Sequence, residues 1–69
     1  MKISARNQLK GKIVSIDRGS VMAKIVLDIG GGNRVVSAIL VDSVDELGLK
    51  VGEEAAAVIK ATEVMIAKP

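Results

Sequence analysis

Several residue types that carry much of protein chemistry are absent from this 69-residue sequence: cysteine, histidine and all three aromatics. Without cysteine the chain can form no disulfide, no iron–sulfur cluster and no thiolate nucleophile. Without histidine as well, a structural zinc site lacks its usual ligands, and we expect no metal bound directly by side chains. No activated nucleophile and no general base suited to neutral pH is evident, so we expect no catalytic residues. An enzyme is the least favoured class.

The sequence also has little net charge and no long apolar run. Its formal net charge is +2, and the cations are scattered along the chain rather than gathered in a basic segment, so charge gives no sign of a nucleic-acid partner. The apolar runs are too short to span a membrane, and no signal-peptide core follows Met1. We therefore expect a cytoplasmic protein with no membrane partner.

The length predicts one domain, residues 1–69, near the lower limit for independent folding. Chains this short usually need disulfides, a metal or oligomerisation to be stable. The composition removes the first two, and hydrophobic residues make up 49% of the chain. Some of that apolar surface is expected to be covered by further copies, which predicts a homo-oligomer.

Val and Ile dominate, and their spacing predicts an all-β domain. Residues 3–16 form one long extended segment, which we expect to bend or bulge at Gly11. Residues 21–29 alternate between apolar and polar positions as a half-buried strand does. The glycines at 30–32 fit a hairpin turn between two strands better than a phosphate-binding loop, which would have to open a helix. Residues 34–41 form the returning strand of this hairpin.

The pattern changes after residue 41. Ser43 and Glu46 fit a capping box, with Ser43 as the N-cap of one short helix and Gly48 as its left-handed stop. A glycine-containing turn follows at 49–54, and residues 55–61 and 63–68 are predicted as the last strands. Five strands with one short helix are typical of a small five-stranded OB-like barrel. An SH3-like barrel is the nearest competitor, because periodicity does not determine strand order.

The groups in this chain that could bind a ligand are mainly hydrogen-bond donors. Ser4 and Arg6 lie two apart on an extended segment, so both side chains point to one face and can donate to a tetrahedral oxyanion. Lys60 is a lone cation in an apolar strand, and 19–21 is a glycine turn with a hydroxyl. Each has an ordinary structural explanation, as a solvated strand face or a turn, and Ser43 has one as a helix cap.

Taken together, these segments resemble the molbindins, small bacterial molybdate-binding proteins made of a single Mop domain. The resemblance covers essentially the whole chain in order, and the segments that carry it are 4–9 (SARNQL), 19–25 (GSVMAKI), 43–49 (SVDELGL) and 58–66 (VIKATEVMI). It implies an OB-like Mop domain, a hexamer built as a trimer of dimers, and storage or buffering of molybdate or tungstate in the cytoplasm.

The resemblance also implies two kinds of oxyanion site at subunit interfaces. The first combines Ser4, Ala5 and Arg6 of one subunit with Ser43, Lys60 and Ala61 of a neighbour. The second lies near a three-fold axis and matches Gly19, Ser20 and Val21. A donor-only pocket suits this ligand, because molybdate is a tetrahedral dianion that carries no proton at neutral pH.

Two other functions fit a small β-barrel. An OB module that binds nucleic acid usually stacks bases on aromatic side chains along a basic groove. This chain has no aromatic residue, so we expect no nucleic-acid partner. The third function is that of a purely structural assembly subunit, in which the hydroxyls only cap turns. Elemental analysis for molybdenum or tungsten in the purified protein would distinguish it from an oxyanion store.

Overall fold

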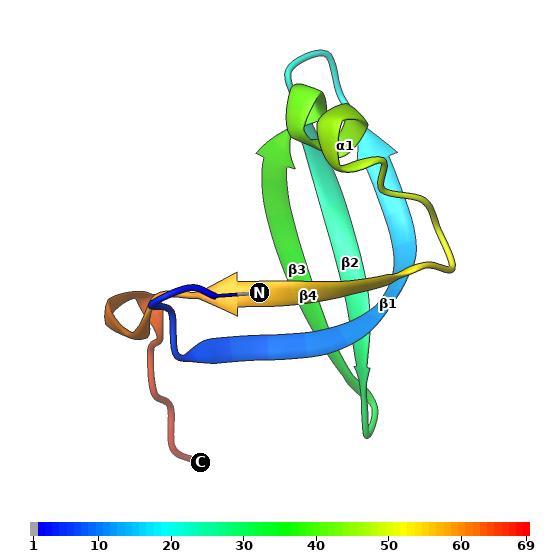
Figure 1. The fold of residues 1–69 in the computed structure, drawn as a ribbon. Coiled ribbons are helices and arrows are strands. Elements are labelled where there is room, and N and C mark those ends of the chain that lie inside the picture. Colours follow the sequence, from blue (N-terminus) through cyan, green and yellow to red (C-terminus); the bar gives the residue numbers. More distant parts are fainter. Residues whose placement is uncertain (1) are drawn as a thin grey trace.

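The computed structural model describes residues 2–69, which fold into one curled antiparallel sheet with a short helix at one end (Figure 1). The sheet has four strands in the order β3-β2-β1-β4. The elements are β1 (Asn7–Arg18), β2 (Met22–Gly30), β3 (Asn33–Leu40), α1 (Val41–Leu47), β4 (Glu54–Ile59) and the 3-10 helix η1 (Ala61–Glu63). The all-β class with one short helix is confirmed, whereas the described residues form four strands rather than five.

The long strand β1 belongs to two ladders, and this curls the sheet into a half-barrel. Its first half pairs with β4, from Asn7 to Lys12, and its second half pairs with β2 from Lys12 onward. The register of the β1–β2 ladder shifts between Ile13 and Ser15, so the irregularity lies after Gly11 rather than at it. Gly11 has a different role, because a Cβ there would collide with the carbonyl oxygen of Asp28 on β2.

The core lies on the concave face of the sheet. Its buried side chains are Ile13, Ala23, Ile25, Leu27 and Val44. Three of them alternate along β2, which confirms the strand predicted from the period of two at 21–29. Val44 comes from α1 and is 2% exposed, so α1 contributes a buried side chain to the core.

The β2–β3 hairpin follows the prediction closely. Gly30, Gly31 and Gly32 all have positive φ angles, which residues with a Cβ adopt at a cost. The Gly30 N–H donates to Oδ1 of Asp28 at 2.9 Å, which holds the turn against the end of β2.

Helix α1 begins three residues earlier than predicted, and Ser43 is not its N-cap. Strand β3 runs directly into the helix with Leu40 in the N-cap position, and no side chain caps the first turn. The Val41 N–H instead donates to the Val21 carbonyl at 2.8 Å. A backbone carbonyl from a distant turn therefore accepts the hydrogen bond of the first N–H of the helix, where no side chain caps it. Gly48 does end the helix in the left-handed conformation, as predicted (φ 63°).

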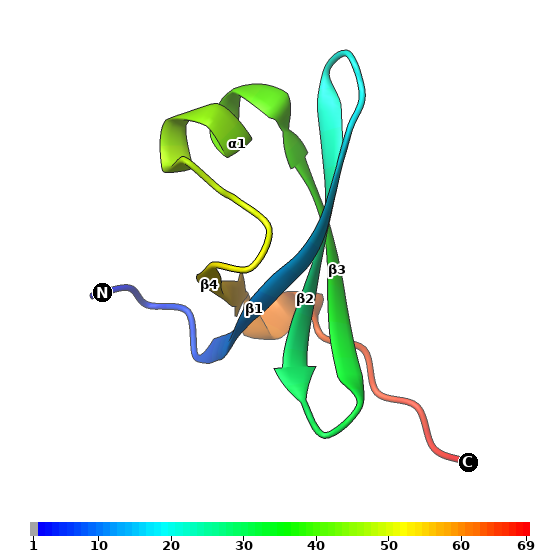
Figure 2. The same ribbon diagram turned by 90° about the vertical axis from the view of Figure 1, so that its right-hand side faces the viewer.

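The predicted strand at 63–68 is not formed. After β4 the chain makes the short turn η1 and then extends away from the half-barrel (Figures 1 and 2). Met65 and Ile66 are 92% and 89% exposed. A strand needs a partner edge, and within one described chain this segment lies beside none.

Candidate functional site

The amino-terminal segment and the segment after β4 meet because of the β1–β4 register. The last pair of this antiparallel ladder is Asn7 with Ile59. Continuing the register by one residue places Arg6 opposite Lys60. The Asn7 side chain reinforces this end of the ladder, since Nδ2 donates to the Ile59 carbonyl at 3.3 Å. Gln8 holds the incoming segment, because Nε2 donates to the Ala5 carbonyl at 3.1 Å.

An open cavity of about 380 Å³ lies where these two segments meet. Its lining contains two cations and two hydroxyls, and no carboxylate. The lining residues are Ile3, Ser4, Ala5, Arg6, Val58, Lys60, Ala61 and Thr62. Such a set can donate hydrogen bonds from a guanidinium, an ammonium and hydroxyl groups to one anion. The cavity is therefore suited chemically to a small oxyanion.

Five of the six residues predicted for the first site line this one cavity. The resemblance placed Lys60 and Ala61 on a neighbouring subunit, but a single chain brings both beside Ser4, Ala5 and Arg6. Thr62 was not predicted, although its position two residues after Lys60 was a usable signal. The nearest carboxylate in the sequence, Glu63, is not part of the lining.

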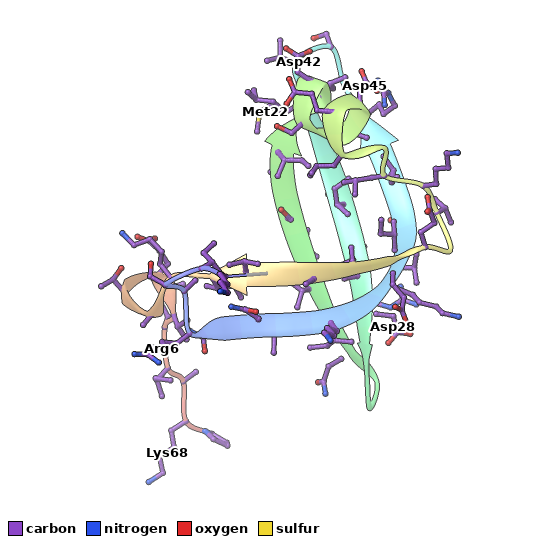
Figure 3. The ribbon with its side chains drawn as sticks, viewed as in Figure 1. Arg6, Met22, Asp28, Asp42, Asp45 and Lys68 are labelled. Carbon is purple, nitrogen blue, oxygen red and sulfur yellow. The ribbon has the colours of Figure 1, made fainter. Side chains whose placement is uncertain are left out.

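Ser43 does not join this cavity within one chain. It lies inside α1, half-buried, at the end of the half-barrel away from η1 (Figure 1). Figure 3 shows the same separation for charged groups, with Arg6 at the η1 end and Asp42 and Asp45 on α1. The carboxylates of α1 are thus remote from the cationic cavity.

The turn predicted as a second site, Gly19, Ser20 and Val21, joins β1 to β2 beside the start of α1 (Figure 1). All three residues are exposed. Two of its backbone groups are already engaged, since Gly19 N–H donates to the Met22 carbonyl at 2.8 Å and the Val21 carbonyl accepts from Val41. The Ser20 hydroxyl stays exposed at the tip. The turn shares its end of the molecule with Ser43 and not with the cavity.

Two further properties hold for residues 2–69. No cluster of three or more Asp, Glu, His or Cys side chains is placed to bind a metal ion. No helix in this part of the chain has the length and apolar character needed to cross a membrane.

Comparison with known proteins gives consistent similarities over nearly the whole chain. The TOBE domain family matches residues 3–66. "Molybdenum-pterin-binding protein 1" of Clostridium pasteurianum is 59% identical over 66 residues, which is 96% of this chain and 97% of that protein. The solved molybdate-binding protein of Sporomusa ovata superposes with a TM-score of 0.92 at 47% identity, over 99% of this chain and 100% of the other.

A third similarity is to ModG, described as a cytoplasmic molybdate-binding protein and solved with molybdate bound. It is 44% identical, with a TM-score of 0.84, and the match covers 88% of this chain and 43% of ModG.

Proposed function

This chain belongs to the TOBE-domain family and, within it, to the molbindins, and from that membership we propose that it binds molybdate in order to store or buffer it. Tungstate has the same shape and charge and is expected to enter the same site. We infer the role of a binder rather than a catalyst, and the related proteins named for binding molybdate support it.

The observation that carries this proposal is the donor-only cavity at the end of the β1–β4 ladder. Arg6 and Lys60 supply two positive charges, and Ser4 and Thr62 supply hydroxyl donors. An anion without a proton can only accept hydrogen bonds. A carboxylate in the lining would repel such an anion and would find no donor on it, so its absence favours binding. Phosphate at neutral pH is partly protonated and would benefit from an acceptor that this lining lacks. Sulfate carries no proton, so its rejection must depend on size.

We propose that the complete site includes Ser43 from another subunit. Within one chain Ser43 lies at the other end of the half-barrel, so it can reach the cavity only across an interface. The hexameric arrangement expected for molbindins, a trimer of dimers, would provide that interface. The exposure of many large apolar side chains, among them Val21, Val36, Leu47 and Val51 at over 60%, supports association. The turn 19–21 is the proposed second oxyanion site.

We place the protein in the cytoplasm with a small oxyanion, and no nucleic acid, as its partner. The ModG relative is described as cytoplasmic, which supports the location. The absence of aromatic side chains argues against base stacking.

Isothermal titration calorimetry tests the proposed function directly. The protein is titrated in turn with molybdate, tungstate, sulfate and phosphate at one pH and ionic strength. We expect saturable heats with molybdate and tungstate and much weaker binding of sulfate and phosphate. Equal heats for all four anions, or none for any, would overturn the proposal.

A further inference from the structure

Half of the residues that line the oxyanion cavity lie on the amino-terminal segment 3–6, before β1 begins. This segment brings the Ser4 hydroxyl and the Arg6 guanidinium to the η1 end of the half-barrel (Figures 1 and 3). It belongs to no strand or helix, because the β1–β4 ladder starts only at Asn7. Much of the cavity wall is therefore formed by chain that no sheet pairing holds in place.

One hydrogen bond ties this segment to the rest of the described chain. The Gln8 side chain reaches back three residues, and its Nε2 donates to the Ala5 carbonyl at 3.1 Å. Within residues 2–69, no other backbone or side-chain hydrogen bond involves residues 2–6. Apolar burial holds the segment only weakly, since Ile3 is 51% exposed. The position of the segment therefore depends largely on the Gln8 amide.

We propose that Gln8 is a positioning residue for the oxyanion site and acts without touching the anion. Gln8 is not part of the cavity lining. Its bond to the Ala5 carbonyl fixes segment 3–6 before the ligand arrives, so that the donors of this segment already face Lys60. The inference rests on the proposed function and adds to it the residue that preorganises the site.

The same hydrogen bond keeps an acceptor away from the anion. A backbone carbonyl oxygen carries a partial negative charge and can only accept hydrogen bonds, so it would repel an oxyanion that it faced. Ala5 lines the cavity, and its carbonyl is engaged by a side chain that lies outside the lining. The donor-only character of the cavity therefore depends on the direction in which Gln8 holds this carbonyl.

The neighbouring amide, Asn7, differs from Gln8 in what it holds. Asn7 Nδ2 donates to the Ile59 carbonyl at 3.3 Å, within a residue pair that the β1–β4 ladder already joins. Loss of this bond would leave the pairing of the two strands in place. Loss of the Gln8 bond would leave residues 2–6 without a hydrogen bond to the rest of the described chain.

Loss of the Gln8 bond should act through the unbound protein. Without it, segment 3–6 samples many conformations, and molybdate must select the one in which the donors converge. The apparent dissociation constant then rises in proportion as the competent conformation becomes rarer. A single neutral hydrogen bond can change that population by about three- to tenfold.

The variant Gln8→Met tests the proposal, because methionine keeps the length and neutrality of the side chain but has no donor. We expect calorimetry with molybdate to give a dissociation constant about three- to tenfold higher than that of the wild type. Lys10→Met is the matched control, since it places the same side chain at an exposed position on β1 outside the cavity lining. It also removes a positive charge, so a general electrostatic effect would be larger in the control. We expect the control to bind nearly as tightly as the wild type.

Nitrogen-15 relaxation provides a measurement that a general loss of stability would not change. In the unbound wild type we expect backbone order parameters of about 0.85 for residues 4–6, as in rigid backbone. In unbound Gln8→Met we expect values below about 0.6. Saturating molybdate should restore the wild-type values, while the strands keep theirs throughout. A flexible segment in the unbound wild type would contradict the proposal without any variant.

Equal dissociation constants for Gln8→Met and the wild type would also contradict it. So would weaker binding with residues 4–6 still rigid in the unbound variant, or an equal loss of affinity in Lys10→Met. Each of these results leaves the proposed function intact, because the wild type still binds molybdate. A wild type that bound no molybdate would instead overturn the proposed function and this inference with it.

Discussion

At the scale of single residues, Arg6 and Lys60 approach one cavity from the two strands of the β1–β4 ladder. We predict that Arg6→Ala and Lys60→Ala each weaken molybdate binding by about tenfold or more, since a hydrogen bond to a charged group contributes about 1.5–3 kcal/mol. Calorimetry gives the dissociation constants, and circular dichroism checks that the fold is retained. Both side chains are exposed, so we expect little change in stability.

The matched control for this pair is Lys10→Ala. Lys10 is an exposed cation on the same strand, outside the cavity lining. If its removal weakened binding as much as removal of Lys60, the effect would be one of overall charge and the assigned cavity would be wrong. Arg6→Lys adds a second comparison, because lysine keeps the charge but loses the forked donor geometry. We expect it to fall between the wild type and Arg6→Ala.

Gly11 gives a prediction about stability alone. Its φ angle is not in the left-handed region, yet an added Cβ would meet the backbone of Asp28 on the neighbouring strand. Backbone cannot move aside as a flexible side chain can, so Gly11→Ala should destabilise by about 1–3 kcal/mol. For a domain of this size that lowers Tm by at least about 4 °C.

Lys12→Ala, one residue further along β1 at an exposed position, is the control and should change Tm by much less. Both melts are recorded at one protein concentration, because association shifts the apparent stability. An unchanged Tm for Gly11→Ala would show that β1 and β2 do not approach as closely as the structure places them.

At the scale of elements, two of the contacts between α1 and the sheet are expected to differ greatly in strength. Val44 is 2% exposed in the core, whereas the Arg18–Asp45 ion pair, at 3.0 Å, has side chains that are 47% and 62% exposed. Val44→Ala removes two buried carbon atoms and should cost about 2 kcal/mol. Arg18→Ala should cost no more than about 0.5 kcal/mol, because exposed ion pairs are weak.

Thermal melting of the two variants decides between them, and salt provides the control. The small effect of Arg18→Ala should vanish at 1 M salt, while the effect of Val44→Ala should persist. Equal losses at low salt would mean that the ion pair stabilises the helix as much as the apolar contact does.

The elements that could be predicted are those that depend on nearby residues. The alternation along β2, the glycine hairpin and the Gly48 stop each follow from a few consecutive side chains. The start of α1 could not be predicted, since its first N–H is satisfied by Val21, twenty residues earlier. The same limit applies to the bulge in β1, which depends on register with β2. Residues 63–68 have the composition of a strand, but a strand also needs a neighbouring strand to pair with, and composition does not specify one.

In the candidate site, too, residue types could be predicted from the sequence, whereas their arrangement in space could not. The donors were recognisable as residue types, and the resemblance to molbindins named most of them. Their meeting within one chain depends on the pairing of Asn7 with Ile59, a contact across 52 residues that no local pattern specifies. Thr62 was not predicted although its spacing from Lys60 was a usable signal, because its place beside the amino-terminal segment depends on this pairing. The role proposed for Ser43 depends on another subunit.

At the scale of the whole molecule, ligand binding and assembly should be linked. If the complete site draws Ser43 from a second subunit, molybdate binds the assembled form and stabilises it by mass action. The gain is about 2.7 kcal/mol for each independent site at a free ligand concentration one hundred times the dissociation constant. We predict that molybdate raises Tm by several degrees and lowers the protein concentration at which the oligomer dissociates. Differential scanning calorimetry and light scattering on serial dilution measure the two effects.

Sulfate at the same concentration and ionic strength controls for general anion effects, and the variant with both Arg6→Ala and Lys60→Ala controls for the site. Each should abolish most of the shift. A molybdate shift that survived in the double variant would place binding elsewhere, with the 19–21 turn as the next position to test. A shift in Tm that did not depend on protein concentration would mean that one chain holds the ligand alone. In that case the cavity residues of a single chain would be sufficient, and Ser43 would be only a helix residue.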